Sequence, residues 1–241
     1  MKKNATYSFL WHLLRWPVKF LLPTKVVCKE HLPLPEKIVT VSNHLSLLDV
    51  AVVGINVKGY RHFVGKKELL ESGFFRWLMR KVDAIPIDRG KADLTAMRKI
   101  VSVLKAGETV TIFPEGTRNR NDESLQEVKA GASLFAIKGE APVVAIMIYR
   151  KPKFFRKNYL YIGEPFYVAE NGSRADTATV NEGALRIEEE MKKGADFLED
   201  YVKNKRWKEI KRNKKAEKKR KKLYTKEAKR AVKALKKGMA K

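Results

Sequence analysis

The chain has 241 residues, of which 44% are hydrophobic, so it is long and apolar enough for one well-packed domain and is not a disordered chain. Its net charge of +25 is concentrated in residues 203–241, which hold 20 Lys and Arg against 3 Glu, and this predicts an anionic partner, either a nucleic acid or a membrane rich in acidic lipid. The single cysteine, Cys28, excludes an internal disulfide, and no Cys and His residues have the spacing of a zinc site.

The first predicted element is an apolar and aromatic segment from Phe9 to Leu22, interrupted by basic residues and a proline. A helix of this length rises about 21 Å, which is short of the ~30 Å hydrocarbon core, so we do not expect it to span a bilayer alone. No small-residue cleavage site follows it, which argues against a removed signal peptide. Trp11 and Trp16 beside basic groups favour a helix lying in the plane of the membrane interface. An ordinary amphipathic helix packed on the core is the alternative.

Short β-branched runs predict strands, and helical patterns lie between several of them. The predicted strands are Lys25 to Cys28, Ile38 to Val41, His62 to Val64, Ala84 to Ile87, Thr109 to Phe113, Val143 to Tyr149 and Tyr159 to Ile162. The predicted helices are Ser46 to Ile55, Lys67 to Val82, Asp93 to Leu104 and Ala130 to Lys138. This alternation predicts an α/β domain with a largely parallel central sheet flanked by helices, and a ligand crevice beyond the carboxyl ends of the strands.

We expect three parts along the chain: a membrane-interfacial helical segment at 1–24, a domain at 25–202 and a Lys-rich basic tail at 203–241. A further helical stretch after Asn181 leads to the tail. In the tail, an apolar stripe at helical spacing predicts a basic helix. Its members are Tyr224, Ala228, Ala231 and Leu235.

The first chemical signal is the block SNHLSLLD, which follows a predicted buried strand directly. A histidine five residues before an aspartate is weak evidence alone, but this context places His44 at the rim of a crevice. Acyl transfer to an alcohol needs a neutral imidazole that accepts the hydroxyl proton and a carboxylate on the other ring nitrogen. We therefore interpret His44 as a general base and Asp49 as its partner. Residues five apart on a regular helix are about 140° apart, so the pair meets only if His44 precedes the helix.

No activated nucleophile is evident, which favours direct attack by an acceptor hydroxyl without an acyl-enzyme. Cys28 and Ser46 are the remaining candidates for a nucleophile. The β-rich setting of Cys28 favours a packing role. The position of Ser46 favours capping of the following helix.

The second chemical signal is FPEGTRNR, which follows the strand from Thr109 to Phe113. Gly116 permits close backbone approach, Thr117 offers a hydroxyl, and Arg118 offers a planar fork suited to phosphate. Together they predict a phosphate clamp, in which Glu115 orders Arg118 or binds glycerol hydroxyls. A solvent-exposed loop with a surface salt bridge is the alternative. If the two strands are neighbours, this loop and His44 face one crevice.

Two weaker blocks also lie at strand ends. AIPIDRG ends a strand and presents Arg89, a second guanidinium for the same phosphate or a plain surface residue. APVV begins an apolar strand with Pro142, which shapes an acyl-chain wall or simply initiates the strand.

In this order, NHLSLLD, the stretch from Gly65 to Arg89 ending in IPIDR, FPEGTR and APVV resemble the four motifs of the glycerolipid acyltransferase family. The chain is most similar to its bacterial 1-acylglycerol-3-phosphate acyltransferases, over about Lys25 to Ile162. The resemblance implies that His44 is the base, with Asp49 as its partner. It assigns the phosphorylated acceptor to Arg89, Glu115, Gly116 and Arg118, and an acyl-donor or acceptor site to Pro142. It also implies no metal and no cofactor, with an acyl-carrier-protein or coenzyme A thioester as co-substrate.

The expected function is therefore transfer of a fatty acyl group to the sn-2 hydroxyl of 1-acyl-sn-glycerol 3-phosphate, which makes phosphatidic acid. We expect a peripheral protein on the cytoplasmic face of the cell membrane, with the tail on acidic lipids. Acylation of glycerol 3-phosphate or another lysolipid is the nearer alternative. A nucleic-acid-binding protein accounts for the tail but leaves NHLSLLD, FPEGTR and the aromatic N-terminal segment unexplained.

Overall fold

The computed structural model describes residues 5–88, 90, 93–119, 125–170, 172–203, 215–222 and 225. The chain divides into two compact units, residues 1–198 and residues 199–241. The strands are β1 (Thr24–Val27), β2 (Ile38–Ser42), β3 (Arg61–Lys66), β4 (Ile85–Ile87), β5 (Thr109–Ile112), β6 (Val143–Ile148) and β7 (Asn158–Ile162). The helices are α1 (Ala5–Leu21), α2 (Asp49–Asn56), α3 (Gly73–Lys81), α4 (Leu94–Lys105), α5 (Gly131–Gly139) and α6 (Thr177–Lys203), with short 3₁₀ helices η1 (Lys29–His31) and η2 (Lys67–Glu71).

One seven-stranded sheet, in the order β1-β7-β6-β2-β5-β3-β4, forms the centre of the first unit. All neighbouring pairs are parallel except β6 and β7, which are antiparallel. Every residue of β2 and of β6 is buried, and such continuous apolar runs are typical of parallel strands covered on both faces. The predicted α/β class with a largely parallel sheet is confirmed.

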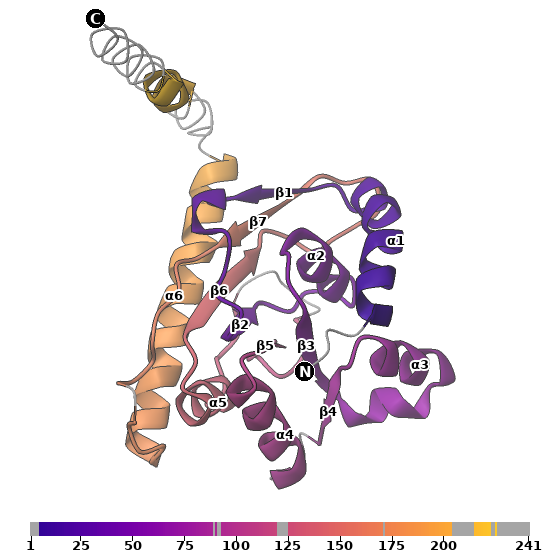
Figure 1. Ribbon diagram of the computed structural model, residues 1–241, viewed down its shortest axis with the longest axis vertical. Coiled ribbons are helices and arrows are strands. Elements are labelled where there is room, and N and C mark those ends of the chain that lie inside the picture. The colour runs from indigo at the N-terminus through magenta and orange to yellow at the C-terminus, as the bar shows by residue number, and fades with distance from the viewer. Residues whose placement is uncertain are drawn as a thin grey trace, which may run out of the picture. The chain divides into compact units, whose positions relative to one another are not determined.

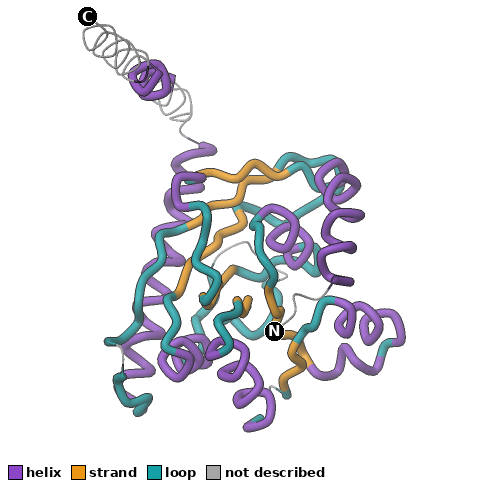
Figure 2. Tube along the Cα trace, in the orientation of Figure 1, coloured by secondary structure: helices purple, strands orange, loops and turns teal. Residues whose placement is uncertain are grey.

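The helices cover both faces of this sheet (Figure 1; Figure 2). On one face, α1 and α2 pack on a cluster that includes Val144, Ile146 and Ile148 of β6. On the other face lie α4, α5 and α6. Gly194 of α6 packs closely on Met147 of β6, because a Cβ atom added at Gly194 would lie 2.8 Å from the Cγ atom of Met147. Alternate residues of β6 thus point to opposite layers, as the pleat of a strand requires.

Several element boundaries differ from the sequence prediction for local reasons. The predicted helix from Lys67 to Val82 is broken into η2 and α3, because Ser72 between them is extended, and Ser and Gly73 both have low helix propensity. Cys28 has left-handed backbone angles and ends β1 one residue early. The helix predicted from Ser46 begins at Asp49.

The N-terminal segment forms α1, which packs against α2. The indole N–H of Trp11 donates a hydrogen bond of 3.0 Å to the carbonyl oxygen of Gly54. Among the residues described, no helix combines the length and the apolar character needed to cross a bilayer. The predicted apolar stripe of the tail, from Tyr224 to Leu235, lies outside the described residues.

Candidate active site

The two predicted motifs meet because the strands that carry them are parallel neighbours. In the register of β2 and β5, Val41 lies opposite Ile112, so His44 and Glu115 each follow three residues beyond that pair. The backbone N–H of His44 donates to Oε1 of Glu115 at 2.9 Å, and the N–H of Asn119 donates to the carbonyl oxygen of His44 at 2.8 Å. Both motifs therefore meet at the carboxyl edge of the sheet, as expected for neighbouring parallel strands.

Asp49 fixes the conformation of the His44 turn. Its Oδ2 accepts hydrogen bonds from Nδ1 of His44 at 2.9 Å and from the backbone N–H groups of Leu45 and Ser46, both at 2.6 Å. His44 lies in the turn before α2, and Asp49 is the first residue of that helix, which is how a spacing of five residues brings the side chains together. Because the fully buried carboxylate accepts a hydrogen bond from Nδ1–H of His44, Nε2 is the ring nitrogen left with a lone pair.

The imidazole of His44 is held by its surroundings and is largely buried. Its ring stacks on Phe113, with centroids 4.2 Å apart and planes 22° apart, and 11% of the side chain is exposed. The preceding residue, Asn43, is fixed by two hydrogen bonds to the backbone of Ile148 in β6. These contacts join the His44 turn to the strands on both sides of β2, and pattern reasoning identified neither Phe113 nor Asn43 as a support.

Glu115 contacts the backbone of the His44 turn, a contact that the sequence did not predict. Only 3% of Glu115 is exposed, and its Oε2 is buried without a hydrogen-bond partner among the described residues. Burial raises the pKa of Glu115 to about 7, with a smaller upward contribution from the charge of Asp49, while backbone N–H groups of His44 and Gln126 act in the opposite direction. Glu115 therefore links the two motifs at the level of the backbone.

The loop after Glu115 carries the predicted phosphate clamp. Gly116 has a φ of 74°, a conformation that favours glycine, and Arg118 is half-buried. The Thr117 hydroxyl donates a 3.3 Å hydrogen bond to the side chain of Gln126. Lys129 lies directly over Gly116, since a Cβ atom there would be 2.8 Å from the Lys129 ammonium. Lys129 thus adds a second cation to the loop. The sequence did not predict this role, because Lys129 lies outside every recognised motif.

Of the other predicted residues, Pro142 and Cys28 lie apart from His44, whereas Ser46 belongs to the same turn. The carbonyl oxygen of Pro142 accepts a hydrogen bond from the N–H of Val39, at the start of β2, about 16 Å along the strand from His44. Cys28 follows β1, which two strands separate from β2. The Ser46 hydroxyl accepts a 3.2 Å hydrogen bond from the N–H of Leu48 and closes the turn into α2. Arg89 lies outside the described residues.

The fold and this site define an α/β protein with a buried histidine–aspartate pair at the carboxyl edge of a largely parallel sheet. The sequence model of the family described as Acyltransferase matches residues 23–149, more than half of the chain. The chain belongs to this acyltransferase family, and the resemblance noted from its motifs is confirmed.

Named relatives agree with the family. The 1-acyl-sn-glycerol-3-phosphate acyltransferase of Bacillus subtilis (strain 168) is 33% identical over 171 residues, which are 68% of this chain and 84% of the relative. The alpha form of that enzyme from Homo sapiens is 29% identical over 64% of this chain and 56% of its own length. The crystal structure of the LPA acyltransferase PlsC from Thermotoga maritima matches with a TM-score of 0.63 at 23% identity, over 82% of this chain and 84% of that chain. This structural likeness supports the fold.

The buried carboxyl of Glu115 predicts a specific pH dependence of stability. Because its pKa of about 7 lies above the usual 4.5, the folded protein binds a proton between these pH values that the unfolded chain does not. The contribution of Glu115 to the free energy of unfolding therefore falls as the pH rises through this window. Glu115→Gln keeps an oxygen for the His44 N–H and cannot ionise. As the pH rises from 4.5 to 7, we expect the free energy of unfolding of Glu115→Gln to increase relative to that of the wild type by up to about 3 kcal/mol.

Urea unfolding of both proteins across this pH range measures the difference directly. The subtraction removes the contributions of all other titrating groups. A constant difference between the two proteins would show that Glu115 titrates in the ordinary range and would contradict its assignment as a buried acid.

Proposed function

We propose that this protein transfers a fatty acyl group from an acyl thioester to the sn-2 hydroxyl of 1-acyl-sn-glycerol 3-phosphate and so makes phosphatidic acid. The observation that carries the proposal is the 2.9 Å contact of His44 with Asp49, immediately beside a loop that presents Arg118 and Lys129. A base and a cationic anion site in one crevice suit an acceptor with both a hydroxyl and a phosphate. The named relatives act on this acceptor.

In the proposed reaction, Nε2 of His44 accepts the proton of the acceptor hydroxyl as its oxygen attacks the thioester carbonyl carbon. The new C–O bond forms and the C–S bond breaks, and the imidazolium returns the proton to the departing thiolate sulfur. Asp49 stabilises the imidazolium through Nδ1, and it can do so without rearrangement because two backbone N–H groups already hold it. The donor is a thioester of acyl-carrier protein or coenzyme A, and the reaction uses no cofactor.

Arg118 and Lys129 hold the phosphate in this proposal, with Gly116 and Thr117 shaping the loop. Arg89 remains a proposed second guanidinium, and Pro142 a proposed part of the acyl-chain wall. Pro142 lies roughly 16 Å from His44 along β2. An acyl chain bound beside His44 would therefore reach Pro142 only by running parallel to that strand. Glycerol 3-phosphate has the same phosphate and hydroxyl groups, so it is the alternative acceptor.

We expect His44→Ala to lower the rate of acyl transfer by at least ~10²-fold, because the hydroxyl then loses its general base. Asp49→Asn should also lower kcat, because an amide cannot stabilise the imidazolium in the same way. The measurement is transfer of a labelled acyl group from acyl-carrier protein and from coenzyme A to lysophosphatidic acid and to glycerol 3-phosphate. His12→Ala, at an exposed histidine of α1, is the control and should keep wild-type activity. Near-native turnover by His44→Ala would rule out the mechanism.

Arg118→Ala should raise the KM for lysophosphatidic acid and lower kcat, since phosphate binding both recruits and orients the acceptor. Steady-state kinetics with varied acceptor test this, with Arg98→Ala on the exposed side of α4 as the charge-matched control. An unchanged KM would remove Arg118 from the phosphate site.

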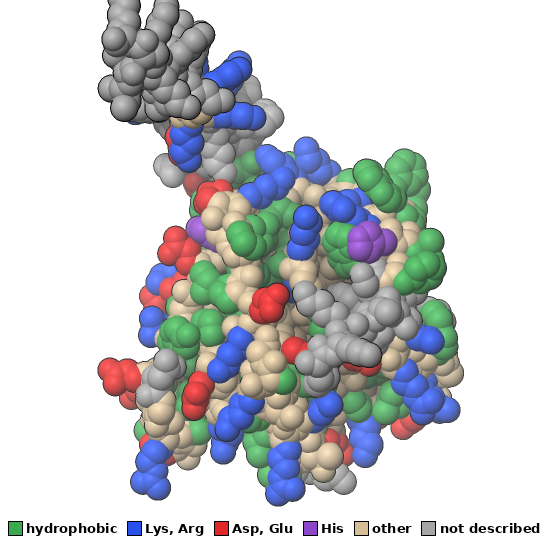
Figure 3. Space-filling view, in the orientation of Figure 1, with side chains coloured by type: hydrophobic (Ala, Val, Ile, Leu, Met, Phe, Trp, Pro, Cys, Tyr) green, Lys and Arg blue, Asp and Glu red, His purple; other side chains and the backbone are tan. Residues whose placement is uncertain are grey.

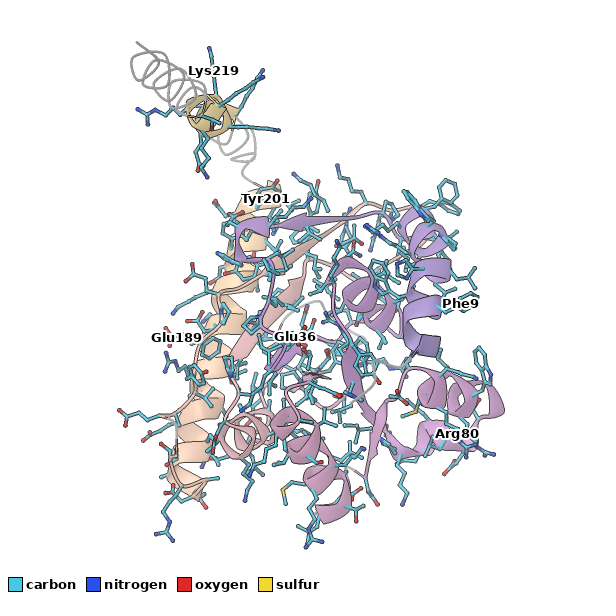
Figure 4. All side chains as sticks on the ribbon, in the orientation of Figure 1. Phe9, Glu36, Arg80, Glu189, Tyr201 and Lys219 are labelled. Atoms are coloured by element: carbon cyan, nitrogen blue, oxygen red, sulfur yellow. The ribbon has the colours of Figure 1, made fainter. Side chains whose placement is uncertain are left out.

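We further propose that the protein binds the cytoplasmic face of the cell membrane through α1 and the basic tail. Phe9, Leu13, Trp16 and Phe20 are spaced by four, three and four residues, so they share one face of α1, and each is more than half exposed. Figure 4 shows the labelled Phe9 on the outer side of this helix. Such a face suits insertion into the membrane interface. The tail adds attraction to acidic lipids, to which each basic residue near the surface contributes up to ~1 kcal/mol.

The two membrane contacts have different signatures in vesicle sedimentation. A chain ending at Val202 should still bind neutral vesicles but lose most of its salt-sensitive binding to anionic vesicles, because it lacks the tail. The double variant Trp16→Ser and Phe20→Ser should lose binding to neutral vesicles. Unchanged anionic binding by the shortened chain would exclude the tail, and unchanged neutral binding by the double variant would exclude α1.

A further inference from the structure

The first unit contains a large cavity that the proposed reaction does not use. It has a volume of about 860 Å³, within the range of small-molecule sites. It lies between α1, β1, η1 and the carboxyl end of α2. Its lining residues are Trp11, Arg15, Lys19, Pro23, Thr24, Lys25, Val26, Lys29, Leu32, Pro33, Leu34, Ile55, Asn56, Lys58 and Lys157.

The charged side chains of this lining are all of one sign. Six basic residues face the cavity, and none of the described residues that line it is acidic. Burial lowers the pKa of Lys19, and the neighbouring charges of Arg15, Lys29 and Lys58 lower it further. These cations repel one another, so a bound anion relieves the repulsion and is favoured there.

The cavity is separate from the catalytic crevice. Asp49 is the first residue of α2 and contacts His44, whereas Ile55 and Asn56 at the other end of the same helix line the cavity. The helix is eight residues long and spans roughly 10 Å. Neither His44 nor any residue of the FPEGTR loop lines the cavity. An anion bound here is therefore not the acceptor phosphate held by Arg118.

The cavity borders the exposed apolar face of α1. Trp11, Arg15 and Lys19 recur every four residues and form a second stripe on α1, about 130° around the helix axis from the stripe of Phe9, Leu13, Trp16 and Phe20. The Trp11 ring is fixed by its hydrogen bond to Gly54, and the Arg15 guanidinium lies 4.8 Å from the ring centroid. One helix thus presents an apolar stripe to its surroundings and a basic stripe to the cavity.

A loop after β6 widens the same apolar face. Phe154 and Phe155 are 57% and 68% exposed, and the Phe155 ring packs against Phe20 with centroids 5.8 Å apart. The N–H of Phe155 donates to the carbonyl oxygen of Leu21, which ties the loop to the end of α1. Figure 3 shows hydrophobic side chains gathered over the outer side of α1, with Lys and Arg side chains beside them. The basic cavity therefore lies at the border of an apolar surface.

We propose that this cavity binds the phosphate headgroup of an anionic membrane lipid, at a site distinct from the acceptor site. The proposal rests on the proposed insertion of α1 into the membrane. With the apolar stripe among acyl chains, the basic stripe lies at the depth of the headgroups, where Lys and Arg side chains reach lipid phosphates. A lipid suits the cavity better than a free phosphate does, because apolar side chains such as Val26, Leu34 and Ile55 share the wall with the cations.

A soluble lipid tests this site without a membrane. The probe is dihexanoyl phosphatidylglycerol below its micelle concentration, added to the full chain while the melting temperature is followed. At ten times its Kd, a ligand of the folded state should raise the melting temperature by roughly 3–5 °C for a protein of this size. We expect that shift for the wild type and less than a third of it for Lys19→Gln. Lys153→Gln is the matched control, because Lys153 is exposed beside Phe154 and does not line the cavity, and it should keep the full shift.

Three outcomes would overturn the proposal. The first is an equal shift in Lys19→Gln and the wild type, and the second is an equal shift with uncharged dihexanoyl phosphatidylcholine. The third is a Lys19-dependent shift with coenzyme A or inorganic phosphate but not with the lipid, which would assign the cavity to a free phosphate or to the acyl donor. Acyl transfer to lysophosphatidic acid, measured in parallel, should be the same in Lys19→Gln and the wild type without phosphatidylglycerol. Loss of transfer in the wild type would refute the proposed function instead, so the two failures are distinguishable.

Discussion

The parallel pairing of β2 with β5 is the constraint on which the site depends. Because the register sets Val41 opposite Ile112, the chain leaves both strands at the same edge, and two motifs 71 residues apart meet there. The His44 N–H then reaches Glu115, and the Asn119 N–H reaches the His44 carbonyl oxygen. Direct hydrogen bonds between the two loops hold the histidine and the cationic loop in a constant relation, which a reaction between a hydroxyl and a bound phosphorylated acceptor requires.

Electrostatics within this crevice separate the roles of two buried carboxyl groups. Asp49 is surrounded by three hydrogen-bond donors on one oxygen, which stabilise its charge and let it orient His44. Each of the two carboxyl groups has one buried oxygen without a hydrogen-bond partner among the described residues, and burial raises the pKa of Glu115 to about 7. Below a pH of about 7, a protonated Glu115 therefore adds no negative charge beside Asp49.

The basic residues of the first unit serve two separate places. Arg118 and Lys129 lie by the loop next to His44, whereas the cavity under α1 collects six cations at the far end of α2. One side of α1 lines this cavity, and another side of the same helix is apolar and exposed. On a membrane, the cations of the cavity would bind lipid headgroups, and Arg118 and Lys129 would stay available for the acceptor phosphate.

The sequence by itself determined the α/β class, the histidine and its aspartate, and the loop from Glu115 to Arg118. It did so because strand periodicity and strand-end chemistry are local properties of the chain. Only the tertiary structure decided the antiparallel pairing of β6 with β7, the contact of Glu115 with the His44 backbone, and the placing of Lys129 over Gly116. Those contacts join residues far apart in the chain. The cavity also brings together distant residues, because its cations come from α1, β1, η1, the loop after α2 and the loop before β7. No local pattern encodes them, because they arise from the sheet order and from the packing of side chains between layers.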